Sequence, residues 1–336
     1  MSKFSFDVMH KRVFPFMEAD DPDIILGAVF GEDVALTRVG GDILASHVDP
    51  IVGAIGNIGR LAVHVACNDI AASGIPPRWI LLLVLAPRPD DEDLLENIMR
   101  DAHRAATEID VSIVGGHTGY SSGLSRPLVA VAALGTASGR KPVGASSAHV
   151  DDLVLVTKGV ALEGTAILAY DFTDVALRLG LSEQDVAEAR QLMAEVSVVP
   201  EAVALAARGA TAMHDVTRGG ILETLLEIAY RSQVGIEIDG VRLPVRPVVS
   251  RFAEAFQFDP LRMISSGTLV ATVPPKRAAD VRSALEEMGM PFAFAGLVRP
   301  GSGVRVLREG QVERYTGIHC EEDELARLWT LYPRGE

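Results

Sequence analysis

Residues 57–74 read NIGRLAVHVACNDIAASG, and this apolar stretch predicts a helix that carries two polar residues, Asn68 and Asp69, in its last turns. Neither position can serve as an N-cap. At 3.6 residues per turn, one stripe about 80° wide collects small residues around the carboxylate: Gly59, Ala62, Ala66, Asp69 and Ser73. Small side chains let another backbone approach closely, and a carboxylate there is poorly solvated unless it meets a cation or donors. Asp69 is therefore either a metal- or phosphate-site residue or a cap on a neighbouring loop.

The composition describes an ordinary globular chain with an acidic balance. The 336 residues are 48% hydrophobic and 23% charged, and this length predicts about two domains. Lys plus Arg total 31 against 45 for Asp plus Glu, a net charge of −14, and the basic residues are scattered. Nucleic acid and anionic membranes are therefore disfavoured as partners. An anionic ligand such as a nucleotide needs a local positive centre, from helix-start N–H groups or a metal ion.

The sequence also predicts the compartment. Charges interrupt every apolar run of MSKFSFDVMHKRVFPF (1–16), so no secretory signal is expected and a cytoplasmic location follows. No run approaches the roughly 18 apolar residues of a membrane-spanning helix, since WILLLVLAP (79–87) has the length of a buried strand. The two cysteines, Cys67 and Cys320, lack a zinc-binding spacing and suit a reducing compartment.

The order of elements predicts mixed α/β sheets in both halves, an α/β (α+β) fold class. Alternating residues on either side of Gly40 and Gly41 indicate a hairpin. The further predicted elements of the first half are a strand ending at 86, a helix over 91–109, and strands over 111–114 and 128–134. A loop rich in Gly, Lys, Pro and Ser (139–152) marks the boundary between domains 1–148 and 149–336. The second half is mostly helical over 163–233 and then alternates strand, strand, helix and strand.

Three further aspartates occupy suggestive positions. Asp33 follows Gly31 at the start of a strand, Asp49 ends the next strand before a proline, and Asp215 precedes a helix start. Taken singly, each is either a site residue or an ordinary solvated loop acid.

The helix start at Thr217-Arg218-Gly219-Gly220 is a candidate anion site, because glycines leave its N–H groups unobstructed and Arg218 suits phosphate. The alternative is a plain Thr N-cap. GAIGNIG (53–59) is not a Rossmann turn, and no P-loop motif occurs, so ATP would bind without either.

Six stretches, taken in order, resemble a superfamily of ATP-using enzymes. It includes aminoimidazole ribonucleotide (AIR) synthetase, selenophosphate synthetase, thiamine-monophosphate kinase and the hydrogenase maturation factor HypE. The motifs of this chain resemble those of HypE most. The stretches are GEDVA (31–35), HVDPIVGAIGNIGRLAVHVACNDIAASGIPP (47–77), VGGHTG (114–119), TKGVALEGTAIL (157–168), MHDVTRGGILETL (213–225) and FDPLRMISSGTLVATVPP (258–275).

The resemblance implies a two-domain PurM-like fold, with a homodimer whose N-terminal sheets pair into a barrel and a C-terminal α/β domain. It implies ATP and Mg²⁺ in the cleft between domains. The implied metal ligands are Asp33, Asp49, Asp69 and Asp215. The implied nucleotide contacts are Asp33, Asn68, Gly115, Gly116, Thr118, Thr217, Gly219 and Gly220. The implied catalytic residues are Asp69, His117, Asp215 and Arg218.

The implied reaction is phosphorylation of an amide- or carboxamide-like oxygen, leading to dehydration or condensation with release of ADP and phosphate. Phosphoryl transfer needs mainly positioning and charge neutralisation, and hard Mg²⁺ takes oxygen ligands and bridges phosphates. The expected partners are ATP and an unidentified small-molecule or protein-borne amide acceptor.

Departures from the family pattern leave open which member of the superfamily this chain corresponds to. HypE carries its substrate on a final cysteine after Pro-Arg, whereas here Pro333-Arg334 is followed by Gly335-Glu336. No reactive cysteine precedes Cys67 as in selenophosphate synthetase, and Asp49 lacks the following lysine of AIR synthetase. His117 stands where thiamine-monophosphate kinase has Asp. It is a hydrogen-bond donor to phosphate, a general base or an ordinary loop residue. A nucleotide-binding partner without turnover and a small-molecule kinase therefore remain alternatives to a HypE-like enzyme.

Overall fold

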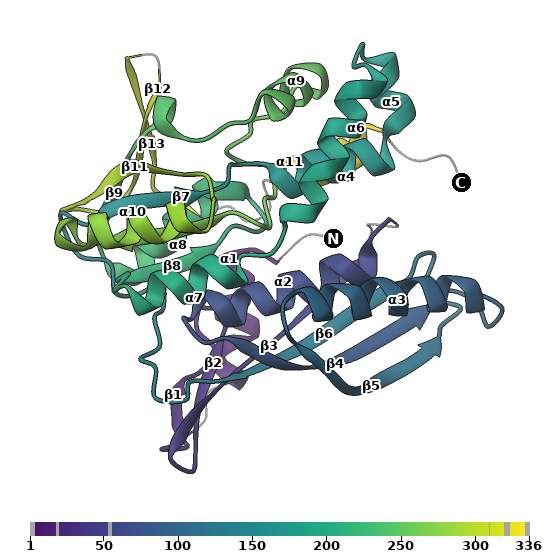
Figure 1. Cartoon of the computed structure of the whole chain (residues 1–336), viewed down its shortest axis with the longest axis horizontal. Helices are drawn as coiled ribbons and strands as arrows, with labels where there is room; N and C mark the ends of the chain where they lie inside the picture. Colours follow the sequence, from purple (N-terminus) through teal and green to yellow (C-terminus); the bar gives the residue numbers. More distant parts are fainter. Residues whose placement is uncertain (1–3, 18–19, 53–55, 309, 319–322, 333–336) are drawn as a thin grey trace.

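The computed structural model describes residues 4–17, 20–52, 56–308, 310–318 and 323–332, and it contains two β-sheets with helices packed on them (Figure 1). Cys320 and the four residues after Tyr332 lie outside the described residues. The elements of the first half are α1 (Phe6–Arg12), η1 (Phe14–Phe16), β1 (Ile24–Leu26), β2 (Ala35–Val39), β3 (Asp42–Val52), α2 (Ile58–Ala72), β4 (Pro77–Ala86), α3 (Glu92–Glu108), β5 (Ser112–Tyr120) and β6 (Leu128–Thr136).

The second half contributes the remaining elements. They are β7 (Leu153–Thr157), α4 (Leu162–Asp171), α5 (Thr173–Arg178), α6 (Glu183–Gln191), η2 (Leu192–Glu195), α7 (Val199–Ala207), β8 (Ala212–Asp215), α8 (Gly220–Ser232), β9 (Gly235–Asp239), η3 (Gly240–Arg242), α9 (Pro247–Phe256), β10 (Leu269–Val273), η4 (Pro275–Arg277), α10 (Ala278–Glu287), β11 (Phe292–Arg299), β12 (Gly303–Arg308), β13 (Gln311–Tyr315) and α11 (Glu324–Leu331).

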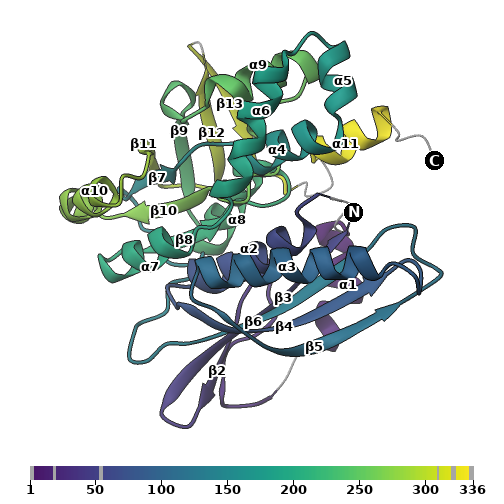
Figure 2. The ribbon, with the colours of Figure 1, turned by 45° about the vertical axis from the view of Figure 1, so that its right-hand side comes forward.

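The first sheet has the order β1-β2-β3-β6-β4-β5. The predicted hairpin is confirmed, because β2 and β3 pair antiparallel around the two glycines. Burial alternates along β6, where Val129, Val131 and Ala133 are fully buried and their neighbours are not. This period of two places one face of the sheet against α2 and α3 (Figure 2), while Val48 and Leu81 on the other face are exposed.

The second sheet has the order β13-β12-β9-β11-β7-β10-β8. All strands from β7 onward belong to it, so the boundary expected after residue 148 lies in the connection between the two sheets. Strands β12 and β13 and helix α11 were not among the elements predicted from sequence. None of the helices in the described part of the chain has the length and apolarity needed to cross a membrane.

Helix α2 lies between the two halves, and this buried position explains why its residues are mostly apolar or small. It contacts the first sheet and α3 on one side and α7 and β8 on the other (Figure 2), and every residue except Arg60 is buried. The small stripe allows the expected close approach, because a Cβ on Gly59 would lie 2.2 Å from the backbone oxygen of Ile98 on α3. One hydrophobic core joins both halves through this helix, from Ile58 to Leu205 on α7.

Strand β5 corrects one sequence-based boundary. The predicted strand ended at residue 114, with a glycine-rich loop after it, but β5 continues through the GGHTG segment to Tyr120 as the edge strand of the sheet. The periodicity signal failed because these glycines, like His117 and Thr118, give no alternation of apolar and polar side chains. A glycine is required at position 116, because a Cβ there would lie 1.9 Å from the backbone oxygen of Leu82 on β4.

Candidate functional site

Four aspartates that are far apart in sequence line two neighbouring cavities that share lining residues. Asp33 precedes β2, Asp49 is on β3, Asp69 is in the last turns of α2 and Asp215 ends β8. Asp33, Asp49 and Asp69 line a cleft of about 940 Å³, within the usual size range of ligand pockets. Asp33 and Asp69 also line a smaller cavity with Asp215. The fold therefore brings together the four aspartates that the motifs singled out.

His214 lies at the centre of one group of carboxylates. Its Nε2 is 3.3 Å from Oδ2 of Asp33 and 3.5 Å from Oε2 of Glu227, and its Nδ1 is 2.7 Å from the backbone oxygen of Asp215. Burial lowers the pKa of His214, but the nearby carboxylates of Asp215, Asp33 and Glu227 outweigh it and raise that pKa well above the usual value.

His47 on β3 makes a similar arrangement with Asp69. Its Nε2 lies 3.0 Å from Oδ2 of Asp69, and its Nδ1 contacts the backbone oxygen of Asp33. Burial lowers the pKa of His47, yet the Asp69 and Asp33 charges raise it to about 10. Burial and the charge of Asp215 raise the pKa of Asp69, which His47 partly offsets. The cluster thus holds more negative charge than its own imidazoles neutralise.

Asp215 shows that the site suits a cation. Its side chain is 1% exposed, and neither carboxylate oxygen has a hydrogen-bond partner. An unpaired buried carboxylate is costly, and a metal ion coordinated by its oxygens removes that cost. One ligand atom each from Asp33, His214 and Asp215 lie within 4.8 Å of one another. These residues therefore fit a divalent cation of the kind that the sequence motifs imply.

The start of α8 differs from the open anion site that the sequence predicted. The N–H of Gly219 donates to Oδ2 of Asp323 at 3.1 Å, and the N–H of Gly220 donates to the backbone oxygen of Thr217. A carboxylate of the chain itself thus occupies part of the helix N-terminus. Thr217 and Arg218 line the cleft with Asp33, Asp49 and Asp69.

The GGHT residues lie apart from the cleft within one chain. Gly115, Gly116, His117 and Thr118 are exposed on β5, and none of them lines the cleft. His117 pairs with Leu83 of β4 across the sheet. Their predicted contacts with nucleotide therefore require another surface beside this edge strand.

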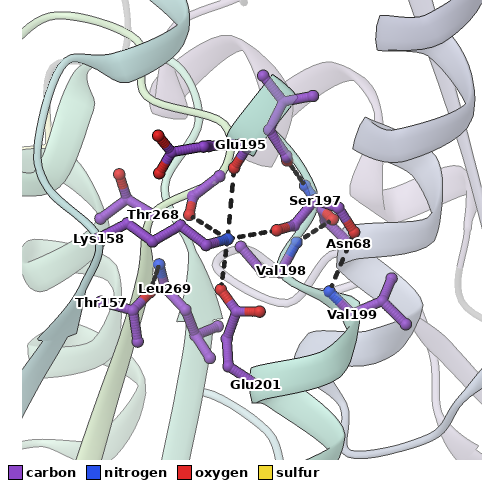
Figure 3. A network of polar contacts seen from close by, with 12 residues as sticks. Asn68, Thr157, Lys158, Glu195, Ser197, Val198, Val199, Glu201, Thr268 and Leu269 are labelled. Carbon is purple, nitrogen blue, oxygen red and sulfur yellow. Dashed lines mark hydrogen bonds and ion pairs between the residues drawn. The ribbon is translucent and has the colours of Figure 1, made fainter. Parts of the chain in front are cut away.

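Asn68 faces away from the aspartates and joins the two halves. Its side-chain NH₂ donates to the backbone oxygen of Val196, and its Oδ1 accepts from the N–H of Val198, both at 2.8 Å (Figure 3). Asn68 is fully buried, and both ends of its amide are satisfied. The expected nucleotide contact does not match this position, because the side chain holds the 196–198 loop instead.

Lys158 holds the same loop from the other side. Its Nζ donates to the backbone oxygens of Glu195, Ser197 and Gly267 and forms a 2.6 Å ion pair with Glu201 (Figure 3). Lys158 is 7% exposed and Glu201 is fully buried. Three segments of the second half therefore meet at one buried charge.

Sequence reasoning missed three residues of the site. Glu163, inside one of the matching motifs, lines the cleft with 3% exposure and accepts from the N–H of Ser266, and burial raises its pKa. The signal for His47 and His214 was a histidine close to an aspartate in HVD and MHD. All three histidines lie in matching stretches, but only His117 was predicted as a site residue.

Comparison with known proteins identifies the family. Residues 31–137 match the family described as AIR synthase related protein, N-terminal domain, and residues 149–308 match its C-terminal domain. The carbamoyl dehydratase HypE of Bradyrhizobium diazoefficiens is 32% identical over 243 residues, covering 71% of this chain and 67% of that protein. The chain belongs to the AIR synthase-related family that includes HypE. The family predicted from the motifs is thereby confirmed.

Solved structures agree with this AIR synthase-related fold. A structure of HypE in complex with ATP has a TM-score of 0.71 at 23% identity and covers 96% of each chain. A structure of ThiL complexed with AMPPCP and TMP has a TM-score of 0.70 at 21% identity, covering 86% of this chain and 91% of that one. Both confirm the predicted mixed α/β fold with two sheets.

Proposed function

We propose that this chain is an ATP- and Mg²⁺-dependent enzyme of the HypE type, which phosphorylates an amide- or carboxamide-like oxygen and so leads to dehydration or condensation. The supporting observation is that Asp33, Asp49, Asp69 and Asp215 line two neighbouring cavities, with Asp33 and Asp69 lining both. Without a cation, these four carboxylates would repel a triphosphate. Mg²⁺ held by these aspartates would supply the missing positive charge beside the phosphates.

The chain's own residues then have distinct tasks. Asp33, Asp69 and Asp215 hold the cation, with Asp49 beside them on the cleft wall. Arg218 and Thr217 lie on the same cleft as the aspartates, where a guanidinium and a hydroxyl suit phosphate oxygens. Glu163, a carboxyl with a raised pKa on this wall, suits proton transfer to or from the acceptor.

The reaction balances without an oxidant or reductant. The acceptor's amide oxygen bonds to the γ-phosphorus, the bond from that phosphorus to the β–γ bridging oxygen breaks, and ADP leaves. Loss of inorganic phosphate then removes the oxygen from carbon, with the amide protons released during dehydration. Phosphorylation thus turns a poor leaving group into a good one, and the protein's task is positioning and charge neutralisation.

We also propose that a second copy of this chain packs on the face of the first sheet opposite α2 and α3. That face carries Val48 on β3 and Leu81 on β4, which are 64% and 43% exposed, in register with Ala132 of β6 between them. A continuous apolar sheet face is typical of an interface. A homodimer formed there would also bring a second chain close to β5 and its His117.

The proposed function is tested by nucleotide binding and turnover. Asp69→Asn and Asp215→Asn should each weaken Mg²⁺-dependent ATP binding by about tenfold or more, because each removes a cation ligand. Asp90→Asn, at a carboxylate 79% exposed, is the matched control and should bind as the parent does. Calorimetry measures the affinity, and unchanged binding in both site variants would remove the assignment.

The same preparation separates the reaction types. An amide panel is incubated with γ-labelled ATP, and we expect acceptor-stimulated release of labelled inorganic phosphate. Label retained on a stable product would instead indicate a small-molecule kinase. ATP binding without stimulated turnover by any amide would favour a nucleotide-binding partner.

A further inference from the structure

We infer that the segment formed by residues 193–198 clamps the two halves of the molecule together, and that Asn68 is the positioning residue through which the clamp fixes Asp69 relative to the residues that the second half contributes to the cleft. The inference rests on the proposed function only for its consequence, which is nucleotide affinity. The relative position of the halves is itself measurable without nucleotide.

The first half holds this segment from helix α2. Nε of Arg60 donates to the backbone oxygen of Met193 at 3.2 Å. About two helical turns further along α2, the Asn68 side chain donates to the oxygen of Val196 and accepts from the N–H of Val198, both at 2.8 Å. Two anchors on one helix fix the direction of the segment as well as its distance from α2.

The second half holds the same segment from β7 and from the start of α9. Lys158, which follows β7, donates through Nζ to the backbone oxygens of Glu195 and Ser197 (Figure 3). Nη1 of Arg246, which precedes α9, donates to Oε1 of Glu195 at 2.8 Å. The backbone oxygens of residues 195, 196 and 197 are therefore bound in turn by the second half, the first half and the second half again.

Core packing does not replace these contacts. Val196 and Val198 are fully buried, so without Asn68 their backbone groups lose a partner that water cannot readily supply. Apolar burial is non-directional, whereas these hydrogen bonds fix both distance and angle. The segment also touches the second half backbone to backbone, because a Cβ on Gly267 would lie 2.3 Å from the oxygen of Glu195. The segment therefore has little freedom to shift between the halves.

Each half has an anchor directly beside a residue of the cleft. Asp69 follows Asn68 on α2 and lines both cavities. In the second half, Nζ of Lys158 also donates to the backbone oxygen of Gly267 at 3.1 Å, and the preceding Ser266 lines the cleft. A shift in the clamp would therefore displace Asp69 relative to the wall that carries Ser266. A misplacement of about 1 Å can lower the rate of a reaction about a hundredfold.

The first measurement reads the distance between the halves without nucleotide. Spin labels are attached at Glu96→Cys on α3 and Val241→Cys on η3, at positions that are 69% and 83% exposed. The background carries Cys320→Ser, and Cys67 is fully buried and therefore unreactive toward the label. Labelled protein is diluted with unlabelled protein, so that double electron–electron resonance reads distances within one chain. The parent should give one narrow distance distribution.

Asn68→Ala should lose this single narrow distribution, because it removes the anchor beside Asp69. Val298→Ala truncates a fully buried side chain on β11 and is the destabilised control, which should keep the parent's distribution. Urea unfolding shows that both variants fold and are less stable than the parent. A narrow distribution in Asn68→Ala, or equal broadening in both variants, would overturn the inference.

The second measurement is the affinity for a non-hydrolysable ATP analogue with Mg²⁺, by calorimetry. Asn68→Ala should bind the analogue about tenfold or more weakly, since Asp69 is no longer held in place. Arg246→Gln loosens the clamp from the second half and should shift the affinity in the same direction. Arg251→Gln is its matched control and should bind as the parent does, because Arg251 pairs with two carboxylates of α6 instead.

The outcomes separate the clamp from the proposed function. A broadened distance distribution with unchanged analogue affinity in Asn68→Ala would overturn the positioning role. Should Asn68→Ala fail to fold, Arg246→Gln decides by the same two measurements. A parent that binds no nucleotide would contradict only the proposed function, because the distance measurement still decides whether the clamp fixes the halves.

Discussion

Asn68 and Asp69 are adjacent on α2 and serve different parts of the molecule. One helical step of about 100° separates their side chains, so Asn68 reaches the 196–198 loop while Asp69 reaches His47. Both polar residues of the opening stretch are therefore explained by partners far away in sequence. The sequence pointed to Asp69 through its small neighbours, but it held no sign of the loop that pairs with Asn68.

His47 should make the stability of the metal-free protein depend on alkaline pH. Its folded-state pKa of about 10 lies above the ordinary value of 6.5, so the folded chain keeps a proton that the unfolded chain releases as pH rises. The stabilisation is complete below pH 6.5 and is lost between 6.5 and about 10. The free energy of unfolding should fall by up to about 1.4 kcal/mol per pH unit in this window.

Urea unfolding of EDTA-treated protein across that window measures the decline. His47→Gln should flatten it, whereas His149→Gln, at an exposed position, should keep the parent's slope. Identical slopes in all three proteins would show that His47 does not hold the proton.

Among the elements, those with a clear period were predictable and those without one were not. Helices α2 and α3 and the β2–β3 hairpin follow directly from apolar spacing and the glycine pair. The end of β5 was missed because its glycines fit a strand only where β4 approaches closely. The candidate aspartates were predicted from the sequence, and HVD and MHD marked the two histidines, whereas Glu163 could be found only from the segments that meet in space.

The loop between η2 and α7 should depend on the Lys158–Glu201 pair. Removing one partner of a buried pair leaves an uncompensated charge, so Lys158→Met should lower the free energy of unfolding by about 3–5 kcal/mol. The double change Lys158→Met with Glu201→Leu removes both charges and should recover part of that loss. Lys276→Met, at an exposed lysine, is the matched control and should be near neutral.

Urea unfolding of the four proteins decides the point. A double variant that is only as stable as Lys158→Met alone would show that removing the buried charge of Glu201 recovers nothing. In that case the three carbonyl contacts of Lys158 would be the main stabilising interaction.

At the scale of the whole molecule, the two faces of the first sheet differ in what covers them. One face packs on α2 and α3, and through α2 on the second half, so the site between the halves is rigidly supported. The other face presents exposed apolar side chains, Val48 and Leu81, in the described chain. Such a face is costly in water, and a symmetric second copy would bury it against itself.

Leu81→Glu should therefore convert the protein to a monomer while leaving its fold intact. Leu81 is 43% exposed in the single chain, so a carboxylate there meets water in the monomer and an apolar surface in the proposed dimer. Val241→Glu, at an 83% exposed position on η3 in the second half, is the matched control and should remain dimeric. Analytical ultracentrifugation gives the mass, and circular dichroism checks the fold. A parent protein that sediments as a monomer at micromolar concentration would contradict the proposed dimer, and His117 would then have no nearby second chain.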